Sequence, residues 1–427
     1  MRRKILSLFL TLAAVMVSMT ASSAIASDPT ATDYSFAQCS GSLMPYPTDI
    51  RPAEYPDTLV PVFINHVGRH GSRFPASAAN TNALTRVLER ADSLGSITKK
   101  GRQLLALCRE VTARSTNRWG ALDSLGMAEQ RGIASRMFMN YAPLLSNAKI
   151  HAISSYSPRV MMSMYEFTHQ LDRLDNHIEF TTTTGRINSP LVRPFDTDQD
   201  YVDFRREEPY KEAYDTYFAS VAPEAPIERV AGTNFPYTSD AERRNFSLIE
   251  YYVVAGCDAM SVAVNPADYF TKEEYNALWS CFNLRQYLQR TATTFSSIPA
   301  DIASDLLSDI IATTDAAAAG KTQAQAELRF GHAETLMPLL SLMRLQGCYY
   351  LTNYFDTVAL HWRDFDVVPM AANIQFILFK NPKTGRFYLR TMLNETPVPL
   401  IPNDPRLFLP WEEARTYLGH CLPLYKQ

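Results

Sequence analysis

The sequence predicts an α/β sheet interrupted by a large, mainly α-helical domain. Residues 59–66 form a near-continuous apolar run, which is typical of a strand covered on both faces. Patterns typical of helices and strands then alternate as far as about residue 174. Residues 175–320 contain mostly helical patterns, and strand character returns at residues 328–331. This order indicates one sheet whose strands are separated by a helical insertion.

The elements before the insertion follow from proline placement and apolar spacing. The prolines of residues 27–57 indicate an extended arm that leads to the first strand. A second strand is expected at residues 149–154. Pro158 stands where proline commonly begins a helix, and this helix should end near Leu174. Three helices are expected between the two strands, at residues 83–94, 101–112 and 127–141.

The insertion and the elements after it are predicted in the same way. Within the insertion, helical spacing is clearest at residues 247–254, 272–290 and 302–311. After it, residues 335–345 are predicted to be helical. Two antiparallel strands are expected at residues 373–380 and 385–393, joined by a turn at Asn381-Pro382-Lys383-Thr384. We therefore expect an α/β domain made of residues 27–174 and 321–427, with residues 175–320 as the insertion.

The first 26 residues are typical of a secretory signal peptide. A basic stretch at residues 2–4 precedes an apolar run, and Ala24-Ile25-Ala26 fits a cleavage site. We therefore expect cleavage near Ala26 and an exported protein, either periplasmic or extracellular. No later run of about 18 apolar residues follows, so no contact with a membrane is expected. We expect the protein to be a monomer.

Charge and cysteine content narrow the function further. The formal net charge of the 427 residues is −3, which argues against a nucleic-acid-binding protein. An even number of cysteines in an exported chain permits three disulfides, and Cys257 with Cys281 is the first candidate pair. The alternative is that some of the cysteines are buried thiols. The six are Cys39, Cys108, Cys257, Cys281, Cys348 and Cys421.

The most informative stretch, Arg69-His70-Gly71-Ser72-Arg73-Phe74-Pro75, directly follows the first strand. In α/β sheets, ligands bind outside the carboxyl ends of the strands. Each arginine offers a planar fork of donors that suits phosphate oxygens. A neutral histidine between them can attack the bound phosphate and form a phospho-histidine. The alternative is a surface turn with two solvated arginines, which the preceding strand and the following proline make less favoured.

Two further stretches fall at predicted strand ends. Arg159 lies in the first turn of a helix, where free N–H groups favour anions, and can add a third phosphate contact. In Gly331-His332-Ala333-Glu334, His332 can donate to a phosphate oxygen and Glu334 can protonate a departing alkoxide. Taken singly, these are also explained by a surface arginine and a helix start with a favourable glutamate. Their shared position at strand ends favours a common site.

Together these stretches resemble those of the histidine acid phosphatase family, the branch of the phosphoglycerate mutase-like superfamily that includes phytases. Residues 69–75 fit the family's R-H-G-x-R-x-P in full. Most members have His-Asp at the last site, whereas His332-Ala333-Glu334 is similar to the multiple inositol polyphosphate phosphatase branch. The resemblance covers roughly residues 58–170 and 325–395.

The resemblance implies a doubly wound, phosphoglycerate mutase-like sheet with a large, mainly α-helical insertion domain that contributes to the substrate pocket. It implies hydrolysis of inositol polyphosphates such as phytate, without a metal or an organic cofactor. The alternatives are an acid phosphatase of broad specificity, a phosphate-transferring mutase and an inositol-phosphate-binding protein without turnover. The implied roles are nucleophile for His70, proton donor for Glu334, and binding of the scissile phosphate for Arg69, Arg73, Arg159 and His332.

A polyanionic substrate needs additional cations, which a net-negative chain must concentrate locally. Candidates for the substrate pocket are the pairs Arg205-Arg206 and Arg243-Arg244, with Lys99-Lys100 less favoured. For each pair the alternative is solvated surface charge. Ala319-Gly320-Lys321-Thr322 resembles the end of a P-loop, but Asp315 stands where its first glycine should be. The spacing of the histidines fits no common metal site.

Overall fold

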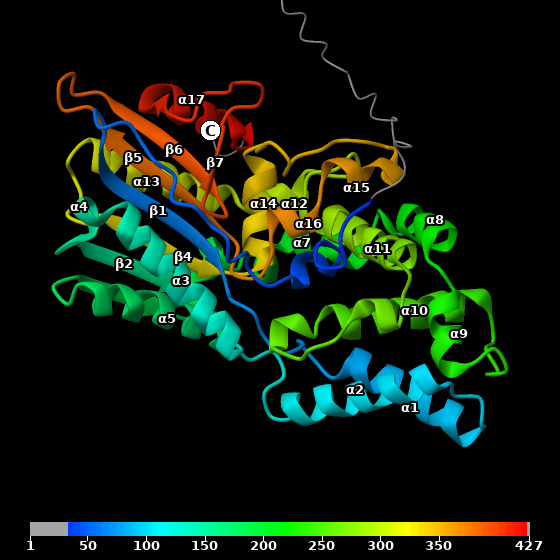
Figure 1. The fold of residues 1–427 in the computed structure, drawn as a ribbon. Coiled ribbons are helices and arrows are strands. Elements are labelled where there is room, and N and C mark those ends of the chain that lie inside the picture. Colours follow the sequence, from blue (N-terminus) through cyan, green and yellow to red (C-terminus); the bar gives the residue numbers. More distant parts are fainter. Residues whose placement is uncertain (1–32, 425–427) are drawn as a thin grey trace, which may run out of the picture.

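The computed structural model describes residues 33–424, so the predicted signal peptide lies outside the described residues. Its centre is an eight-stranded sheet in the order β3-β2-β4-β1-β5-β6-β7, with β8 paired to β6 (Figure 1). The strands β1 to β4 pair in parallel, whereas β5 to β8 join the sheet by antiparallel pairing. The strands are β1 (Val60–Arg69), β2 (Lys149–Ser154), β3 (Glu179–Thr184), β4 (Ala326–Gly331), β5 (Asn373–Lys380), β6 (Phe387–Leu393), β7 (Thr396–Val398) and β8 (Leu409–Pro410).

Helices cover both faces of the sheet, as the apolar run of the first strand predicts. On one face, Ile64 of β1 belongs to the same hydrophobic cluster as residues of α3 and α5. On the other face, Phe63 and Val67 lie in a cluster with residues of α13, α14 and α17. Successive strand side chains point to opposite faces, so one apolar strand serves both clusters. These helices are α3 (Ser124–Asn140), α4 (Ala142–Leu145), α5 (Pro158–Leu174), α13 (Ser304–Ala318), α14 (Ala333–Leu342) and α17 (Trp411–Cys421).

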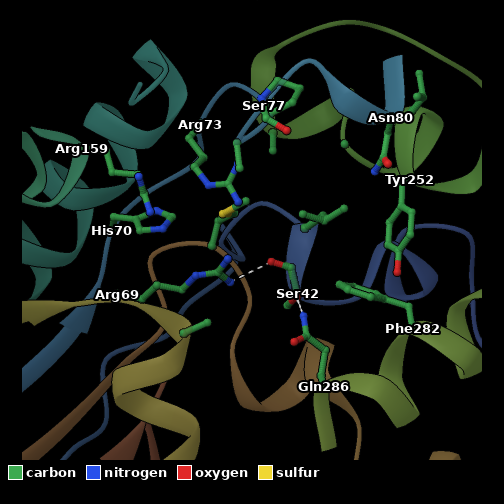
Figure 2. Close-up of a pocket in the computed structure, with 18 of the residues that line it drawn as sticks. Ser42, Arg69, His70, Arg73, Ser77, Asn80, Arg159, Tyr252, Phe282 and Gln286 are labelled. Atoms are coloured by element: carbon green, nitrogen blue, oxygen red, sulfur yellow. Dashed lines mark hydrogen bonds between the residues drawn. The ribbon is translucent and has the colours of Figure 1, made fainter. Parts of the chain in front are cut away.

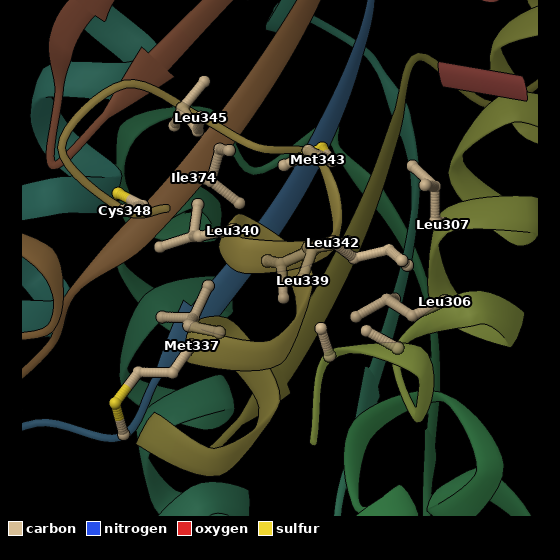
Figure 3. Close-up of a cluster of buried hydrophobic side chains, with 14 of the residues drawn as sticks. Leu306, Leu307, Met337, Leu339, Leu340, Leu342, Met343, Leu345, Cys348 and Ile374 are labelled. Carbon is tan, nitrogen blue, oxygen red and sulfur yellow. The ribbon is translucent and has the colours of Figure 1, made fainter. Parts of the chain in front are cut away.

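The most apolar of these helices is α14, which begins directly after β4. Figure 3 shows its side chains Met337, Leu339 and Leu340 among Leu306 and Leu307 of the neighbouring helix α13. All five side chains are buried almost completely. Burying a leucine stabilises the fold by about 1.5–3 kcal/mol. The start of α14, which carries Glu334, is therefore fixed by dense packing behind it.

A second body of helices packs beside the sheet and has a hydrophobic cluster of its own. The early helices α1 and α2 pack there against α9 and α10, although more than a hundred residues separate the two pairs (Figure 1). The helical body therefore contains residues that come before strand β2 in the chain as well as residues that come after it. Its helices are α1 (Ala79–Ser93), α2 (Lys99–Ser115), α8 (Lys211–Val221), α9 (Ala225–Ala231), α10 (Asp240–Ala255) and α11 (Lys272–Arg290).

Helix α11 connects the helical body to the sheet. Leu278 and Trp279 in its middle belong to the cluster of the helical body, whereas Tyr287 and Leu288 near its end belong to the cluster on the sheet. A Thr271 capping box begins the helix. Its last residue, Arg290, lies beside the start of α14. The short helices that complete the fold are α6 (Ser189–Val192), α7 (Gln199–Glu207), α12 (Ile298–Asp301), α15 (Val358–His361) and α16 (Asp364–Val367).

The parallel register explains why the three predicted stretches meet. Arg69 at the end of β1 is paired with Gly331 at the end of β4, and Ser154 at the end of β2 is paired with Phe330. Parallel strands place their carboxyl ends at one edge of the sheet. His70, Arg159 and His332 follow these three ends within a few residues and therefore emerge at the same place.

The main predicted elements are present, but strands β3, β7 and β8 and helix α17 have no counterpart among the predictions. β2, α5, α11 and β5 have the predicted boundaries. Strand β3, at residues 179–184, falls in the segment predicted to be helical. Its sequence ends in four threonines, and all six side chains are exposed or half-buried because β3 forms the edge of the sheet. An exposed edge strand lacks the apolar alternation by which strands are recognised.

The predicted disulfides are not formed. All six cysteines lie within the described residues, and each is a free, buried thiol. Cys257 and Cys281 are packed separately in the helical body, where the Cys257 thiol donates to the carbonyl oxygen of Val253 (3.2 Å). Burial raises the pKa of the Cys281 thiol to about 12. The alternative interpretation, buried thiols that act as small apolar side chains, therefore applies. Within residues 33–424, no helix is long and apolar enough to cross a membrane.

Candidate active site

A cavity of about 360 Å³ opens at the edge of the sheet where the parallel strands end. Its lining comes from the loop after β1 and the start of α14 on one side, and from α10 and α11 on the other. Figure 2 shows Arg69, His70, Arg73 and Arg159 together on the sheet side, facing Tyr252 of the helical body. The cavity therefore lies between the sheet and the helices, where residues distant in sequence can act on one ligand.

Three arginines in this cavity have no carboxylate partner. Arg69, Arg73 and Arg159 lie in its lining, and none of them is within 4.0 Å of a carboxylate oxygen of residues 33–424. Burial lowers the pKa of Arg69 to about 10 and, with the charge of Arg159, that of Arg73 to about 9. All three remain charged at neutral and acid pH. Uncompensated buried cations are costly, and an anion with several acceptor oxygens would relieve that cost.

The orientation of Arg69 is fixed by main-chain carbonyls. Its Nη1 donates to the carbonyl oxygens of Ser42 (2.7 Å) and Val368. Ser42 is held in turn by Asp364, which accepts a hydrogen bond from the Ser42 backbone N–H (2.7 Å). Asp364 also accepts from the Trp279 indole N–H (2.9 Å), so the N-terminal turn is tied to α11. These contacts leave the guanidinium facing the cavity (Figure 2).

His70 is held with one ring nitrogen free. Its Nδ1 lies 2.9 Å from the carbonyl oxygen of Gly71, which can only accept, so Nδ1 carries the proton. The lone pair is then on Nε2. Burial, followed by the charges of Arg69 and Arg159, holds the pKa of His70 well below its usual range. The imidazole is therefore neutral, and able to act as a nucleophile, even in mildly acid solution.

The loop that carries His70 is held by Glu129 and by an unusually close backbone contact. Glu129 of α3 accepts hydrogen bonds from the backbone N–H and the hydroxyl of Ser72, each at 2.7 Å. Gly126 of the same helix lies against this loop. A Cβ atom at Gly126 would stand 2.2 Å from the Ser72 carbonyl oxygen, and one at Gly71 would stand 2.4 Å from that of Gly126. Neither backbone has room for a side chain.

We expect Gly126→Ala to lower both stability and turnover. Because the new methyl group would push the loop away from α3, unfolding should become easier by about 1–3 kcal/mol. The shift of His70 and Arg73 should also reduce kcat. Urea unfolding followed by tryptophan fluorescence measures the first effect. Gly419→Ala is the matched control, since nothing lies within 4 Å of a Cβ there. Equal urea midpoints for the two variants would contradict the close contact.

His332 is positioned by a residue that no motif revealed. Arg193 Nη1 lies 2.7 Å from His332 Nε2, and the Ser155 hydroxyl lies 3.1 Å from the same atom. An arginine can only donate, and each ring nitrogen of His332 faces one. Because the Arg193 contact at Nε2 is the shorter of the two, we infer that Nε2 accepts and that the single proton of the neutral ring is on Nδ1. Nδ1 is 3.3 Å from Arg159 Nη2. The Nδ1–H group of His332 and the Nη2 of Arg159 are thus neighbouring donors, and an oxyanion placed between them would accept a hydrogen bond from each.

Arg193→Gln should therefore impair catalysis without removing any cavity-lining cation. Without the charged donor, His332 can take the other tautomer, and its donation to a phosphate oxygen is lost. We expect kcat to fall about ten- to a hundred-fold, as for small misplacements of reacting groups. ¹⁵N spectra of the histidine ring nitrogens should show the tautomer change directly. Unchanged ring spectra in Arg193→Gln would contradict this role, whereas a mere loss of packing would leave the tautomer as it is.

Glu334 lies in the cavity as a carboxylate in the unliganded protein. Burial raises its pKa, but the groups around it, the cation of Arg290 first, outweigh burial and hold the pKa well below its usual range. Arg290 Nη2 donates to Glu334 Oε1 at 3.1 Å. A third of the Glu334 side chain is exposed, so it can meet a ligand. In this state it can accept a proton but has none to give.

The other candidate cations do not reach the cavity. Arg205, Arg206, Arg243 and Arg244 are absent from its lining. Arg206 lies on the surface beside Asp203 (2.7 Å), and Glu224 binds both Arg243 (3.2 Å) and Arg244 (2.7 Å). The charges of Arg206, Arg243 and Arg244 are therefore compensated by neighbouring carboxylates, as the alternative interpretation of the sequence had it, whereas the buried Nη1 of Arg205 has no hydrogen-bond partner within residues 33–424. Their assignment to the substrate pocket is corrected accordingly. The polar residues that the helical body does supply are Asn80 and Thr81 of α1, Tyr252 of α10, and Gln286 and Arg290 of α11.

The structure therefore brings together Arg69, His70, Arg73, Arg159 and Glu334 in one cavity, with His332 directly behind its wall. The rings of His70 and His332 are 5.6 Å apart between centroids. A neutral histidine among buried and half-buried arginines that lack carboxylate partners, at the ends of parallel strands with a helical body beside them, is the arrangement expected of an enzyme of the histidine phosphatase class.

Comparison with known proteins agrees with this class. No model of a known protein family matches the chain. Human multiple inositol polyphosphate phosphatase 1 is 27% identical over 386 residues, which cover 80% of this chain and 76% of that protein. The resemblance to the histidine acid phosphatase family, in its multiple inositol polyphosphate phosphatase branch, is thereby confirmed.

Solved structures confirm the fold class. The complex of Bifidobacterium longum multiple inositol polyphosphate phosphatase with inositol hexasulfate superimposes with a TM-score of 0.76 at 18% identity. The match covers 91% of this chain and 99% of that one. The phytase from D. castellii gives a TM-score of 0.70 at 16% identity, over 95% and 90% of the two chains. At such identities the likeness extends to the fold.

Proposed function

We propose that the protein is an exported phosphatase that removes phosphate groups from inositol polyphosphates such as phytate through a phospho-histidine. The observation that carries this proposal is the set of three arginines without carboxylate partners, one buried and two half-buried, around a neutral histidine. Such a site suits a phosphate group with several oxygens. The names of the related proteins support inositol polyphosphates as the substrate class. We also propose that residues 1–26 direct export and that the mature protein acts as a monomer.

In the first step, a phosphate group binds among Arg69, Arg73, Arg159 and the Nδ1–H of His332. The His70 Nε2 lone pair attacks phosphorus, and the bond from phosphorus to the ester oxygen breaks. Glu334, protonated in the substrate complex, gives its proton to the leaving oxygen. Protonation of a poor alkoxide leaving group contributes about 10²–10⁴ in rate. The dephosphorylated inositol leaves as an alcohol.

In the second step, water attacks the phosphorus of the phospho-histidine. The Glu334 carboxylate takes one proton from this water, and the bond from phosphorus to Nε2 breaks. Inorganic phosphate is released, His70 is again neutral, and Glu334 again carries a proton. The arginines neutralise charge throughout, so the steps as written use only side chains of this chain.

A time course with phytate tests the proposal. The purified mature chain is incubated with phytate across pH 3–8, and free phosphate and the remaining inositol phosphates are separated. We expect stepwise loss of phosphate groups and a series of lower inositol phosphates. Binding of phytate without release of phosphate would favour a binding protein. Equal specificity constants for phytate and simple monoesters would favour an acid phosphatase of broad specificity, and transfer to an added alcohol acid without hydrolysis would favour a mutase.

A further inference from the structure

Arg290 has a position that the proposed two-step reaction does not use. It is the last residue of α11 and lines the cavity between the helical body and the sheet. Its Nη2 donates to Glu334, its Nη1 donates to Gln289 Oε1 (3.1 Å), and its buried Nε has no hydrogen-bond partner within residues 33–424. The pair is a single hydrogen bond at 3.1 Å rather than a bidentate one, so Glu334 does not occupy all the donors of the guanidinium.

Glu334 is otherwise surrounded by groups that cannot replace Arg290. His332 precedes it in the chain, Arg69 faces it from β1, and Arg159 and Arg73 act on it from further away. Tyr201 of α7 also lies near enough for the two groups to interact. Among these groups only Arg290 forms an ion pair with the carboxylate. Arg69, Arg73 and Arg159 bind the scissile phosphate in the substrate complex. Its negative charge then offsets the effect of these arginines on the pKa of Glu334.

We propose that Arg290 is a positioning residue that converts Glu334 into a proton donor only when the substrate carries a second anionic group beside the scissile phosphate. The second group draws the guanidinium away from Glu334, and the released carboxylate takes up the proton that it later passes to the leaving oxygen. This inference rests on the proposed function. Its consequence is that binding of a polyphosphorylated substrate makes Glu334 a proton donor, whereas a substrate with a single phosphate group leaves the ion pair of Arg290 and Glu334 intact.

The first test measures proton uptake on binding. The wild-type protein is titrated near pH 5 with inositol hexasulfate, whose sulfate groups remain ionised, by calorimetry in two buffers of different ionisation enthalpy. We expect uptake approaching one proton per bound molecule, and much less with inorganic sulfate. The uptake should disappear in Glu334→Gln and become smaller in Arg290→Gln, where loss of the ion pair raises the pKa of Glu334 in the free protein. Equal uptake in wild type and Glu334→Gln would overturn the proposal.

The second test compares the pH dependence of kcat for phytate and for β-glycerophosphate. In wild type, kcat should fall as the pH rises, and this fall should occur about one pH unit or more higher for phytate than for β-glycerophosphate. The reason is that loss of a neighbouring cation raises the pKa of a carboxyl group by about that amount. In Arg290→Gln the two profiles should converge, because β-glycerophosphate then meets a protonated Glu334 at higher pH. Arg290→Lys should restore part of the separation. Arg244→Gln, at a residue of α10 that pairs with Glu224 and does not line the cavity, is the matched control.

Other outcomes of the second test would overturn the proposal. If Arg290→Gln only raised KM for phytate, with both pH profiles unchanged, Arg290 would be a simple anion-binding residue. If kcat fell equally for both substrates, Arg290 would merely support the position of Glu334. Failure of the wild-type protein to hydrolyse phytate would refute the proposed function itself. The role of Arg290 is judged only from the difference between two substrates that the enzyme turns over.

Discussion

Replacement of His70 by alanine should abolish release of phosphate from phytate. The neutral imidazole lies among the three arginines of the described cavity that have no carboxylate partner, with its Nε2 lone pair free to attack. Loss of a nucleophile lowers kcat by about four orders of magnitude or more. Release of inorganic phosphate measures the effect. Rapid quenching in alkali, which preserves phospho-histidine, should trap a labelled protein in wild type and none in the variant.

Two controls separate loss of chemistry from loss of structure. His70→Ala should still bind inositol hexasulfate, because Arg69 is held by the carbonyls of Ser42 and Val368, and Arg73 by that of Phe74, rather than by His70. His177→Ala changes an exposed histidine, with 73% of its side chain accessible, and should behave as wild type. A His70→Ala variant that retained near-normal turnover would exclude the phospho-histidine mechanism.

Glu334→Gln should slow hydrolysis of phytate by about 10²–10⁴, the contribution expected of a general acid. The amide keeps the size and one acceptor of the carboxyl group but has no acidic proton to give. The loss should depend on the leaving group. An alkoxide needs the proton, whereas p-nitrophenolate is stable without it, so p-nitrophenyl phosphate should be affected far less in the first step. The measurement is kcat for both substrates under the same conditions.

A matched control for this variant is Glu179→Gln on the exposed edge strand β3, which should have no effect on either substrate. If Glu334→Gln slowed the two substrates equally during formation of the phospho-histidine, the carboxyl group would not be the proton donor. A slow second step common to both substrates is recognised by a burst of p-nitrophenol, and it would instead reflect loss of the base that activates water.

The strand-end motifs could be predicted from the sequence because their signals are local. An apolar strand that runs directly into Arg69-His70 fixes both a place in the sheet and a chemistry. Pro158 marks a helix start, and therefore the position of Arg159 in its first turn. His332 and Glu334 stand between a strand and a helix in the same way. Because parallel strands end at one edge, three local patterns sufficed to predict one site.

Arg193 and Arg290 could not be found in this way. Each is an isolated arginine in the segment between the motifs, and its role depends on a partner more than forty residues away. Adjacent pairs such as Arg243-Arg244 gave the stronger sequence signal and proved to be compensated by Glu224 at the surface. Pairing of cations with carboxylates is a property of tertiary packing, so the number of arginines in a segment does not show which ones remain free.

The wide separation of partners in this fold has a consequence for synthesis. Ile64 at the centre of the sheet pairs with Ala326 on one side and with Ile377 on the other. Helix α1 packs against α10, which follows it much later in the chain. Contacts between residues so far apart in the chain slow folding, since long loops must close first. As the chain leaves the ribosome, neither the sheet nor the helical body can be completed before most of the polypeptide has been made. The loop that carries His70 should therefore be synthesised before the cavity around it can form. Truncated nascent chains should be inactive.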